Sequence, residues 1–349
     1  MEILNPQNEK ILVIQTAFIG DAILTLPMVQ VLKKKYPHSY LAVLCIPVTS
    51  EIFNSSNSVD EVIIIDKKAK DKSFFRLTGF IKSLQEKSFT KIYSPHRSLR
   101  TSLIVMSAGV EETYGFDNAA LKHVYKYLIT YRTDYHEVRR NIELAGISTD
   151  EDNWKIKPEI IPGEYQLQLV SEFLDQNDLH GFVTVAPGSV WATKRFPADY
   201  FAELIEYLIS IGKKVVLTGS KEEFDLCEYL RMKVNGSVIN SAGKFSVAGS
   251  VELLKNSSLL ISNDSAPVHM GMAADIPVLT IYCSTIPEFG FYPYNNKSLY
   301  ISYNDLKCKP CGIHGHSVCP IETFDCARKL NTREIITLLN NILDENDKE

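Results

Sequence analysis

Residues 11–35 read ILVIQTAFIGDAILTLPMVQVLKKK. The run Ile11–Gln15 is short and apolar, as in a buried strand, whereas the apolar residues of Ala22–Lys35 recur with helical spacing. Asp21 is the only formal charge from 11 to 32, so the stretch could be mistaken for a membrane span, but polar, glycine and proline residues interrupt it. We therefore predict a strand, a loop and a helix.

The same alternation of strand-like runs and helical patterns continues along the chain. Further predicted strands are Leu41–Cys45, Val62–Ile65, Lys91–Ser94, Phe182–Ala186, Lys214–Thr218, Leu259–Ser262 and Pro277–Tyr282. Further predicted helices are Phe74–Lys87, Leu99–Ser107, Pro197–Ile211, Lys221–Asn235, Val251–Asn256 and Thr332–Leu343. Strands that alternate with helices predict an α/β fold with parallel sheets.

A polar segment with two prolines, Asp150–Gly163, interrupts this alternation near the middle of the chain. At about 150 residues per domain, a chain of 349 residues is long enough for two. We therefore predict two Rossmann-like, doubly wound parallel-sheet domains, residues 1–160 and 161–349. In such sheets ligands bind at the carboxyl ends of the strands, and with two domains the expected site is the central cleft that they face.

The composition is that of a globular protein with mild acidity, since 37 Lys+Arg accompany 42 Asp+Glu for a net charge of -5. A dedicated nucleic-acid binder would show a basic domain, so we expect no nucleic-acid partner. Seven cysteines do not make a secreted disulfide scaffold in a chain of this length, and the sequence does not open with a secretory leader pattern. We expect a cytoplasmic protein.

Asp21 lies where the first loop meets the first predicted helix. It has two interpretations. As an N-cap, its carboxylate would accept hydrogen bonds from backbone N–H groups and be favoured by the helix dipole. As a functional residue, it would act as a general base at the mouth of the cleft.

The first strand of the second half ends in Pro187-Gly188-Ser189, and Lys194 follows shortly before a helix. Gly188 and Ser189 would let backbone N–H groups approach an anion, and Lys194 would bring a positive charge to a phosphate. The alternative is that Lys194 is an exposed lysine on a surface loop.

The next predicted strand ends in Thr218 and Gly219, which precede Glu222 and Glu223. In a nucleotide site these loop residues would approach the ligand, and one carboxylate would accept hydrogen bonds from ribose hydroxyls. Glutamate in a first helical turn is also ordinary helix chemistry.

The segment from Asp264 to His269 combines a polar loop with the start of a helix. Asp264 and Ser265 follow an apolar strand, and a proline falls in the first helical turn, after Ala266. The free N–H groups of such a helix end form a ready pyrophosphate site. His269 would contact the phosphate or serve as a buried packing residue.

Four of the seven cysteines lie within 19 residues, in the pattern C-x2-C-x7-C-x6-C: Cys308, Cys311, Cys319 and Cys326. Clustered cysteines in a cytosolic protein favour a metal site over disulfides, and tetrahedral zinc takes four such ligands. Any zinc would be structural, because four thiolates leave no open coordination position. The alternative is a set of reduced, packed thiols.

Together these segments resemble the ADP-heptose:lipopolysaccharide heptosyltransferase family, nearest its heptosyltransferase II branch. They occur in the family's order over about nine tenths of the chain, and they are Phe18–Pro27, Pro95–Arg100, Tyr114–Asp117, His136–Asn141, Pro187–Ser189, Thr193–Pro197, Asn263–His269 and the Cys308–Cys326 cluster. The resemblance implies a GT-B architecture, with an acceptor site mainly in the first domain and a sugar-nucleotide site mainly in the second. It also implies inverting glycosyl transfer that needs no catalytic metal or other cofactor.

The resemblance assigns roles to residues already singled out. Asp21 becomes the base that deprotonates the acceptor hydroxyl, and Lys194 holds the departing diphosphate. The donor, ADP-heptose or a related nucleotide sugar, would contact Gly188, Ser189, Thr218, Gly219, Glu222, Glu223, Asp264, Ser265, Ala266 and His269. Arg97 and Arg100 could meet anionic groups of the acceptor, although arginines on a helix surface are common.

The implied acceptor is a lipid-linked core oligosaccharide of lipopolysaccharide, reached by peripheral contact with the cytoplasmic face of the inner membrane. Many family members carry glycine where this chain has Ala266, which leaves related donor sugars and a different surface glycan open. Two further classes are a sugar-nucleotide-binding protein without turnover and a zinc-dependent hydrolase that uses the cysteines.

Overall fold

The computed structural model describes residues 9–66 and 74–346. The chain divides into two compact units, Met1–Ile161 and Pro162–Glu349, called unit 1 and unit 2 below. The division lies one residue from the boundary drawn on the sequence. The acceptor and donor roles assigned to the two parts remain predictions.

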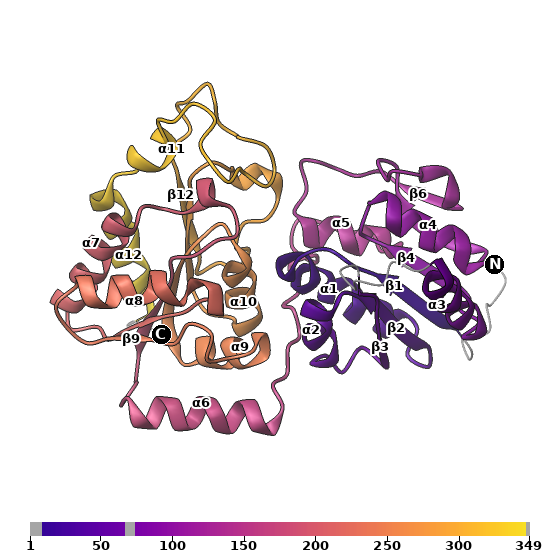
Figure 1. Cartoon of the computed structure of the whole chain (residues 1–349), viewed down its shortest axis with the longest axis horizontal. Coiled ribbons are helices and arrows are strands. Elements are labelled where there is room, and N and C mark those ends of the chain that lie inside the picture. The colour runs from indigo at the N-terminus through magenta and orange to yellow at the C-terminus, as the bar shows by residue number, and fades with distance from the viewer. Residues whose placement is uncertain (1–8, 67–73, 347–349) are drawn as a thin grey trace. The chain divides into compact units, whose positions relative to one another are not determined.

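Unit 1 is built on one parallel sheet of six strands in the order β3-β2-β1-β4-β5-β6 (Figure 1). Its strands are β1 (Lys10–Ile14), β2 (Tyr40–Cys45), β3 (Glu61–Ile64), β4 (Lys91–Ser94), β5 (Glu112–Phe116) and β6 (Tyr127–Ile129). Its helices are α1 (Ile19–Lys35), α2 (Ser50–Asn54), α3 (Phe74–Glu86), α4 (Leu99–Ala108) and α5 (Glu137–Leu144). The register places Val13 of β1 between Val43 of β2 and Tyr93 of β4.

Unit 2 has a second parallel sheet of six strands, in the order β12-β11-β10-β7-β8-β9. Its strands are β7 (Phe182–Ala186), β8 (Val215–Leu217), β9 (Val238–Asn240), β10 (Ser257–Asn263), β11 (Val278–Tyr282) and β12 (Leu299–Ser302). Its helices are α6 (Glu164–Gln176), α7 (Ala198–Ser210), α8 (Phe224–Lys233), α9 (Val247–Lys255), α10 (Ala266–Ala274), α11 (Asp325–Arg328) and α12 (Thr332–Asn346). Val185 of β7 pairs with Leu217 of β8 and Ile261 of β10.

Buried side chains cover both faces of the second sheet. Val183 and Val185 pack into the same cluster as Phe201 of α7, whereas Phe182 packs with Phe173 of α6 on the other face. This alternation explains why the central strands read as continuous apolar runs, since every second side chain meets a different layer of helices. The predicted doubly wound α/β fold is therefore confirmed (Figure 1).

The two sheets share one topology. In unit 1 the strand order reverses between β1 and β4, and in unit 2 it reverses between β7 and β10. At such a switch point the loops that follow the two central strands run to opposite sides and leave room for a ligand. The residues that follow β1, β4, β7 and β10 are therefore the first place to look for a site.

Candidate functional site

Asp21 lies in the first turn of α1, after the carboxyl end of β1. The helix begins at Ile19, three residues before the predicted start, so Phe18 is the N-cap and the interpretation of Asp21 as the N-cap is wrong in position. Asp21 still caps the helix, because its Oδ2 accepts a hydrogen bond from the backbone N–H of Phe18 at 3.2 Å.

The environment of Asp21 suits a base. Burial, the largest cause, raises the pKa of Asp21 to about 6, and the negative charge of Glu137 adds to it, whereas the hydrogen bond from Phe18 and the charge of Arg97 act against it. A carboxylate of this pKa is ionised at neutral pH and still accepts a proton more readily than an ordinary aspartate does. Capping and base chemistry are therefore compatible in this residue.

A buried ion pair on α5 stands near Asp21. Arg140 Nη1 lies 2.9 Å from Glu137 Oε2, and both side chains are buried. The Tyr131 hydroxyl also donates to Glu137 Oε2, at 3.0 Å. Asn141 fixes α5 to α1, because its amide donates to the carbonyl of Leu24. Glu137 was not singled out from the sequence, because only the folded chain brings its charge toward Asp21.

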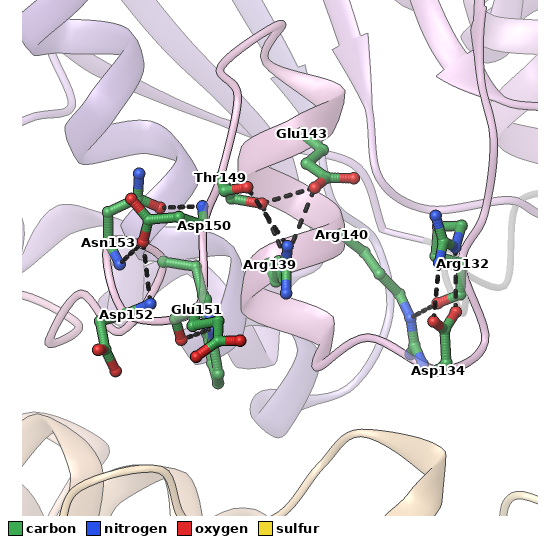
Figure 2. Close-up of polar contacts among 11 residues, drawn as sticks. Arg132, Asp134, Arg139, Arg140, Glu143, Thr149, Asp150, Glu151, Asp152 and Asn153 are labelled. Atoms are coloured by element: carbon green, nitrogen blue, oxygen red, sulfur yellow. Dashed lines mark hydrogen bonds and ion pairs between the residues drawn. The ribbon is translucent and has the colours of Figure 1, made fainter.

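The two neighbouring arginines of α5 make separate contacts within unit 1 (Figure 2). Arg140 Nε donates to the carbonyl of Arg132 at 2.6 Å. Arg139 Nε donates to Thr149 Oγ1 at 2.8 Å and lies 3.6 Å from a carboxylate oxygen of Glu143. Both guanidinium groups thus support the local fold of unit 1.

The loop after β4 brings one of the two predicted acceptor residues to Asp21. The Arg97 guanidinium stacks on the Tyr131 ring at 3.9 Å from its centre, and its charge lowers the pKa of Asp21. Arg100 is instead exposed on α4. His96 was not singled out, yet its Nδ1 lies 2.9 Å from Thr16 Oγ1 and so links the ends of β4 and β1. The acceptor role of Arg97 and Arg100 remains a prediction.

In unit 2, Lys194 and Asp264 form an ion pair across the switch point. Lys194 ends a short 3-10 helix after β7, Asp264 follows β10, and Lys194 Nζ lies 2.6 Å from Asp264 Oδ2. Their side chains are only 13% and 10% exposed, so the interpretation of Lys194 as an exposed surface lysine is wrong. Thr285, which follows β11, donates its hydroxyl to the same oxygen of Asp264 at 2.6 Å.

Asn263 joins the two loops that carry this pair. It is fully buried, its Oδ1 accepts the backbone N–H of Phe196 at 2.9 Å, and its Nδ2 donates to the carbonyls of Pro187 at 2.8 Å and Gly188 at 3.2 Å. Asn263 and Thr285 were given no role from the sequence. The signal was available for Asn263, a polar residue that closes the apolar strand β10, whereas Thr285 lies three residues beyond the end of β11.

The structure separates the two glutamates proposed for ribose. Glu223 lies against the β7 loop, since a Cβ built on Gly188 would fall 1.9 Å from its Oε1. Glu222 is exposed, and hydrogen bonds from its own backbone and from Ser220 lower its pKa. The carboxylate of Glu223 therefore occupies the space that a side chain at residue 188 would fill, and the donor-binding roles of Gly188, Glu222 and Glu223 remain predictions.

The other predicted loop residues lie at the same edge of the sheet. Thr218 is buried, and its backbone N–H donates to the carbonyl of Val185 at 2.9 Å. Gly219 also approaches Glu223, whose Oε2 would be 2.9 Å from an added Cβ. Ser189 is buried, and its carbonyl accepts from Arg195 Nε at 2.6 Å. Their donor-binding roles remain predictions.

The helix α10 begins as predicted, with Ser265 as the N-cap, Ala266 as the first helical residue and a proline in the first turn. The first N–H groups of a helix lack partners within it and favour an anion. His269 is buried behind this end, and burial lowers its pKa to about 4, so the imidazole is neutral at neutral pH. Its Nδ1 is buried and has no hydrogen-bond partner within the described residues.

The four clustered cysteines line one pocket of about 180 Å³, together with His316. Cys326 is buried and the other three are half-buried. Among the described residues, no group of three or more His, Cys, Asp or Glu side chains is arranged to hold a metal ion. The zinc site and the packed-thiol alternative both stay predictions.

Comparison with known proteins decides between the remaining functional classes. Residues 77–320 match the model of glycosyltransferase family 9 (heptosyltransferase). That match spans more than half of the sequence. The chain belongs to glycosyltransferase family 9. The predicted resemblance is therefore confirmed, and the protein is a glycosyltransferase of this family.

Individual relatives of this family agree with the assignment. Lipooligosaccharide heptosyltransferase 2 of Haemophilus influenzae is 26% identical over 297 residues, which cover 80% of this chain and 84% of the relative. The solved family 9 glycosyltransferase of Veillonella parvula has a TM-score of 0.81 at 21% identity, with 98% of this chain and 99% of that chain covered. E. coli ADP-heptose lps heptosyltransferase II has a TM-score of 0.76 at 21% identity, with 97% and 99% covered.

The solved family 9 structures share the predicted GT-B fold. None of the helices in the described ranges combines the length and the apolar composition that a membrane span requires.

Proposed function

We propose that this family 9 enzyme transfers heptose from ADP-heptose to the inner core of lipopolysaccharide, with inversion and without a catalytic metal. Family membership and the similarity to E. coli ADP-heptose lps heptosyltransferase II support the proposal. The observation that carries the chemistry is the pair of switch points, one with a carboxylate of raised pKa and the other with a largely buried lysine paired to the aspartate that precedes α10.

In the proposed reaction, Asp21 accepts the proton of the acceptor hydroxyl while that oxygen attacks the anomeric carbon. The bond between the anomeric carbon and the phosphate oxygen breaks, and ADP leaves with the bonding electrons. Negative charge then grows on the diphosphate, where Lys194 and the N–H groups at the start of α10 stabilise it. These groups supply the charge stabilisation that a divalent ion provides in other transferases.

Asp264 and Glu223 complete the donor site in this proposal. Asp264 is held by Lys194 and Thr285. It would therefore reach the donor as a fixed acceptor for sugar hydroxyls. Glu223, at the β7 loop, takes the ribose role that the sequence left open between two residues. His269 is neutral and therefore contributes no charge to phosphate binding.

We also propose peripheral contact with the inner membrane from the cytoplasmic side, because the proposed acceptor is lipid-linked. Leu99, Leu103 and Met106 support it, since they lie four and three residues apart on α4 and are all exposed. Vesicles of anionic phospholipid should sediment the protein, and Leu103→Glu should weaken that binding, whereas Met232→Glu on α8 should leave it unchanged. Equal binding of both variants would contradict the proposal.

The decisive experiment for the donor is titration calorimetry with ADP, UDP, GDP and CDP, without divalent metal. Selective ADP binding, followed by transfer from ADP-heptose in the presence of a chelator, supports the proposal. Preference for UDP, GDP or CDP would keep the glycosyltransferase and discard heptose. Selective ADP binding without transfer to any core acceptor would indicate the sugar-nucleotide-binding relative.

A further inference from the structure

Residues 308–326, which we call the cysteine loop, contact the donor site through Thr193. The backbone N–H of Thr193 and its hydroxyl both donate to the carbonyl of His316 at 3.1 Å, and the hydroxyl accepts the N–H of His316 at 2.8 Å. Thr193 is 3% exposed. It directly precedes Lys194 in the same 3-10 helix.

A second contact runs through Ser284. Its carbonyl accepts the backbone N–H of Cys311 at 2.9 Å, and its hydroxyl donates to Thr193 Oγ1 at 3.1 Å. The Thr193 hydroxyl, with one hydrogen and two lone pairs, is then fully used. Ser284 directly precedes Thr285, whose hydroxyl holds Asp264. The cysteine loop therefore contacts Thr193, which precedes Lys194, and Ser284, which precedes Thr285.

Gly315 allows the loop to approach this closely. An added Cβ would lie 2.9 Å from both Ser284 Oγ and Thr193 Oγ1, and 3.2 Å from Cγ of Lys194. Gly312, in the same loop, also has a left-handed backbone, but an added Cβ there meets nothing within 4 Å. The φ angles of +76° and +80° impose similar strain on any side chain, so the two glycines are distinguished by what an added Cβ would meet.

We propose that Thr193 is a positioning residue through which the cysteine loop fixes Lys194 against Asp264 for phosphate binding. The inference rests on the proposed function of Lys194. A lysine side chain is flexible and acts as a point charge, so its effect on a leaving phosphate depends on where its backbone is held. The loop supplies that constraint from a segment more than 100 residues later in the sequence.

Thr193→Val keeps the shape of the side chain and leaves the N–H and carbonyl of His316 without their hydroxyl partner. We expect kcat for sugar transfer to fall roughly tenfold or more, because the effect of Lys194 depends on where its charge is held, while the acceptor KM stays within about twofold. Thr193→Ser keeps the hydroxyl and should restore most of the rate. If Thr193 served stability alone, Thr193→Val would lower the unfolding temperature without lowering kcat at an unchanged acceptor KM.

The matched pair Gly315→Ala and Gly312→Ala tests the same link from the loop side. Gly315→Ala should lower kcat like Thr193→Val, whereas Gly312→Ala should keep the parental rate and lose only the thermal stability that its positive φ costs. Parental rates in folded Thr193→Val and Gly315→Ala proteins would overturn the proposal.

A measurement without substrate separates this inference from the proposed function. Competitive acetylation of the folded protein, read by mass spectrometry, reports how accessible the Lys194 amine is. Labelling should rise several-fold in Thr193→Val and Gly315→Ala, and stay parental in Thr193→Ser and Gly312→Ala. If ADP-heptose proves not to be the donor, this result still holds. Unchanged labelling in all four variants would overturn the positioning role even in an active transferase.

Discussion

The two units share one topology, but the charged groups at their switch points have opposite surroundings. The first switch point holds a single carboxylate, Asp21, whose charge is disfavoured by burial and by Glu137. The second holds a lysine already neutralised by a carboxylate, Lys194 with Asp264. Asp21, which must take up a proton, is destabilised in its charged form, whereas Lys194, which must meet a phosphate, lies beside a carboxylate of opposite charge. The fold thus fixes where chemistry occurs, and neighbouring charges decide which chemistry.

The largest expected effect comes from breaking the neutralised pair. Lys194→Met leaves Asp264 buried without its counter-charge, so we expect the free energy of unfolding to fall by about 3 kcal/mol in chemical denaturation. Lys33→Met breaks the ion pair with Asp60, which is more exposed than the pair of Lys194 and Asp264. It should lower the free energy of unfolding by no more than about 1 kcal/mol.

Combining Lys194→Met with Asp264→Asn should recover most of that stability without recovering transfer. If Lys194→Met costs no more than Lys33→Met, the pair contributes to stability as an ordinary surface ion pair does, and the contrast between the two units is lost.

The next effect concerns the lone carboxylate. Asp21→Asn should lower the rate of transfer at least roughly a hundredfold, the usual contribution of a general base, with nucleotide affinity unchanged by calorimetry. Asp60→Asn, at the amino end of the same sheet, is the control and should keep the parental rate. Transfer at the parental rate by Asp21→Asn would remove Asp21 from the reaction.

The same substitution should stabilise the protein. The folded-state pKa of about 6 lies above the usual 3.8, so the native state binds the proton more tightly, and stability falls as pH rises from about 4 to 6. Asparagine avoids this cost and can still accept from Phe18. We expect Asp21→Asn to raise the free energy of unfolding by roughly 3 kcal/mol at pH 7 and by about half of that at pH 5. An equal or lower stability at pH 7 would mean that the carboxylate is not destabilised.

The smallest effect isolates Glu137. The transfer rate of the parental enzyme should fall as pH drops through about 6, because Asp21 becomes protonated. Glu137→Gln removes a charge that raises the pKa of Asp21, so this fall should move to lower pH, by less than one unit. Glu143→Gln, on the same helix and beside Arg139, should leave the profile in place. Coincident profiles would show that the charge of Glu137 does not contribute to the raised pKa of Asp21.

The sequence predicted the architecture well where strands are central and apolar. The bounds of β4 and β7 match those read from the residues, because both strands are buried on two faces. The strands β5, β6, β9 and β12 were missed, since three to five residues of mixed polarity give no period to read. Their formation depends on pairing with a strand that is already in place.

The charged residues of the candidate site could be predicted from the sequence, but the residues that they contact could not. Asp21, Lys194 and Asp264 stand beside strand ends, where a pattern of apolar runs locates them. That Lys194 pairs with Asp264, 70 residues away, or that Glu223 rather than Glu222 meets Gly188, depends on loop conformation. The start of α1 shows the same limit, because Phe18 is no usual N-cap and the helix uses Asp21 to satisfy the free N–H instead.

The ion pair of Lys194 and Asp264 affects which anions the donor site binds. A bare buried lysine at a helix N-terminus would collect any small anion in solution. A lysine that already has a carboxylate offers little to chloride or orthophosphate, and yields only to a ligand that gains further contacts elsewhere. Asp264 thus competes with solution anions for Lys194. Nucleotide affinity should therefore depend less on added salt than it would if Lys194 were unpaired.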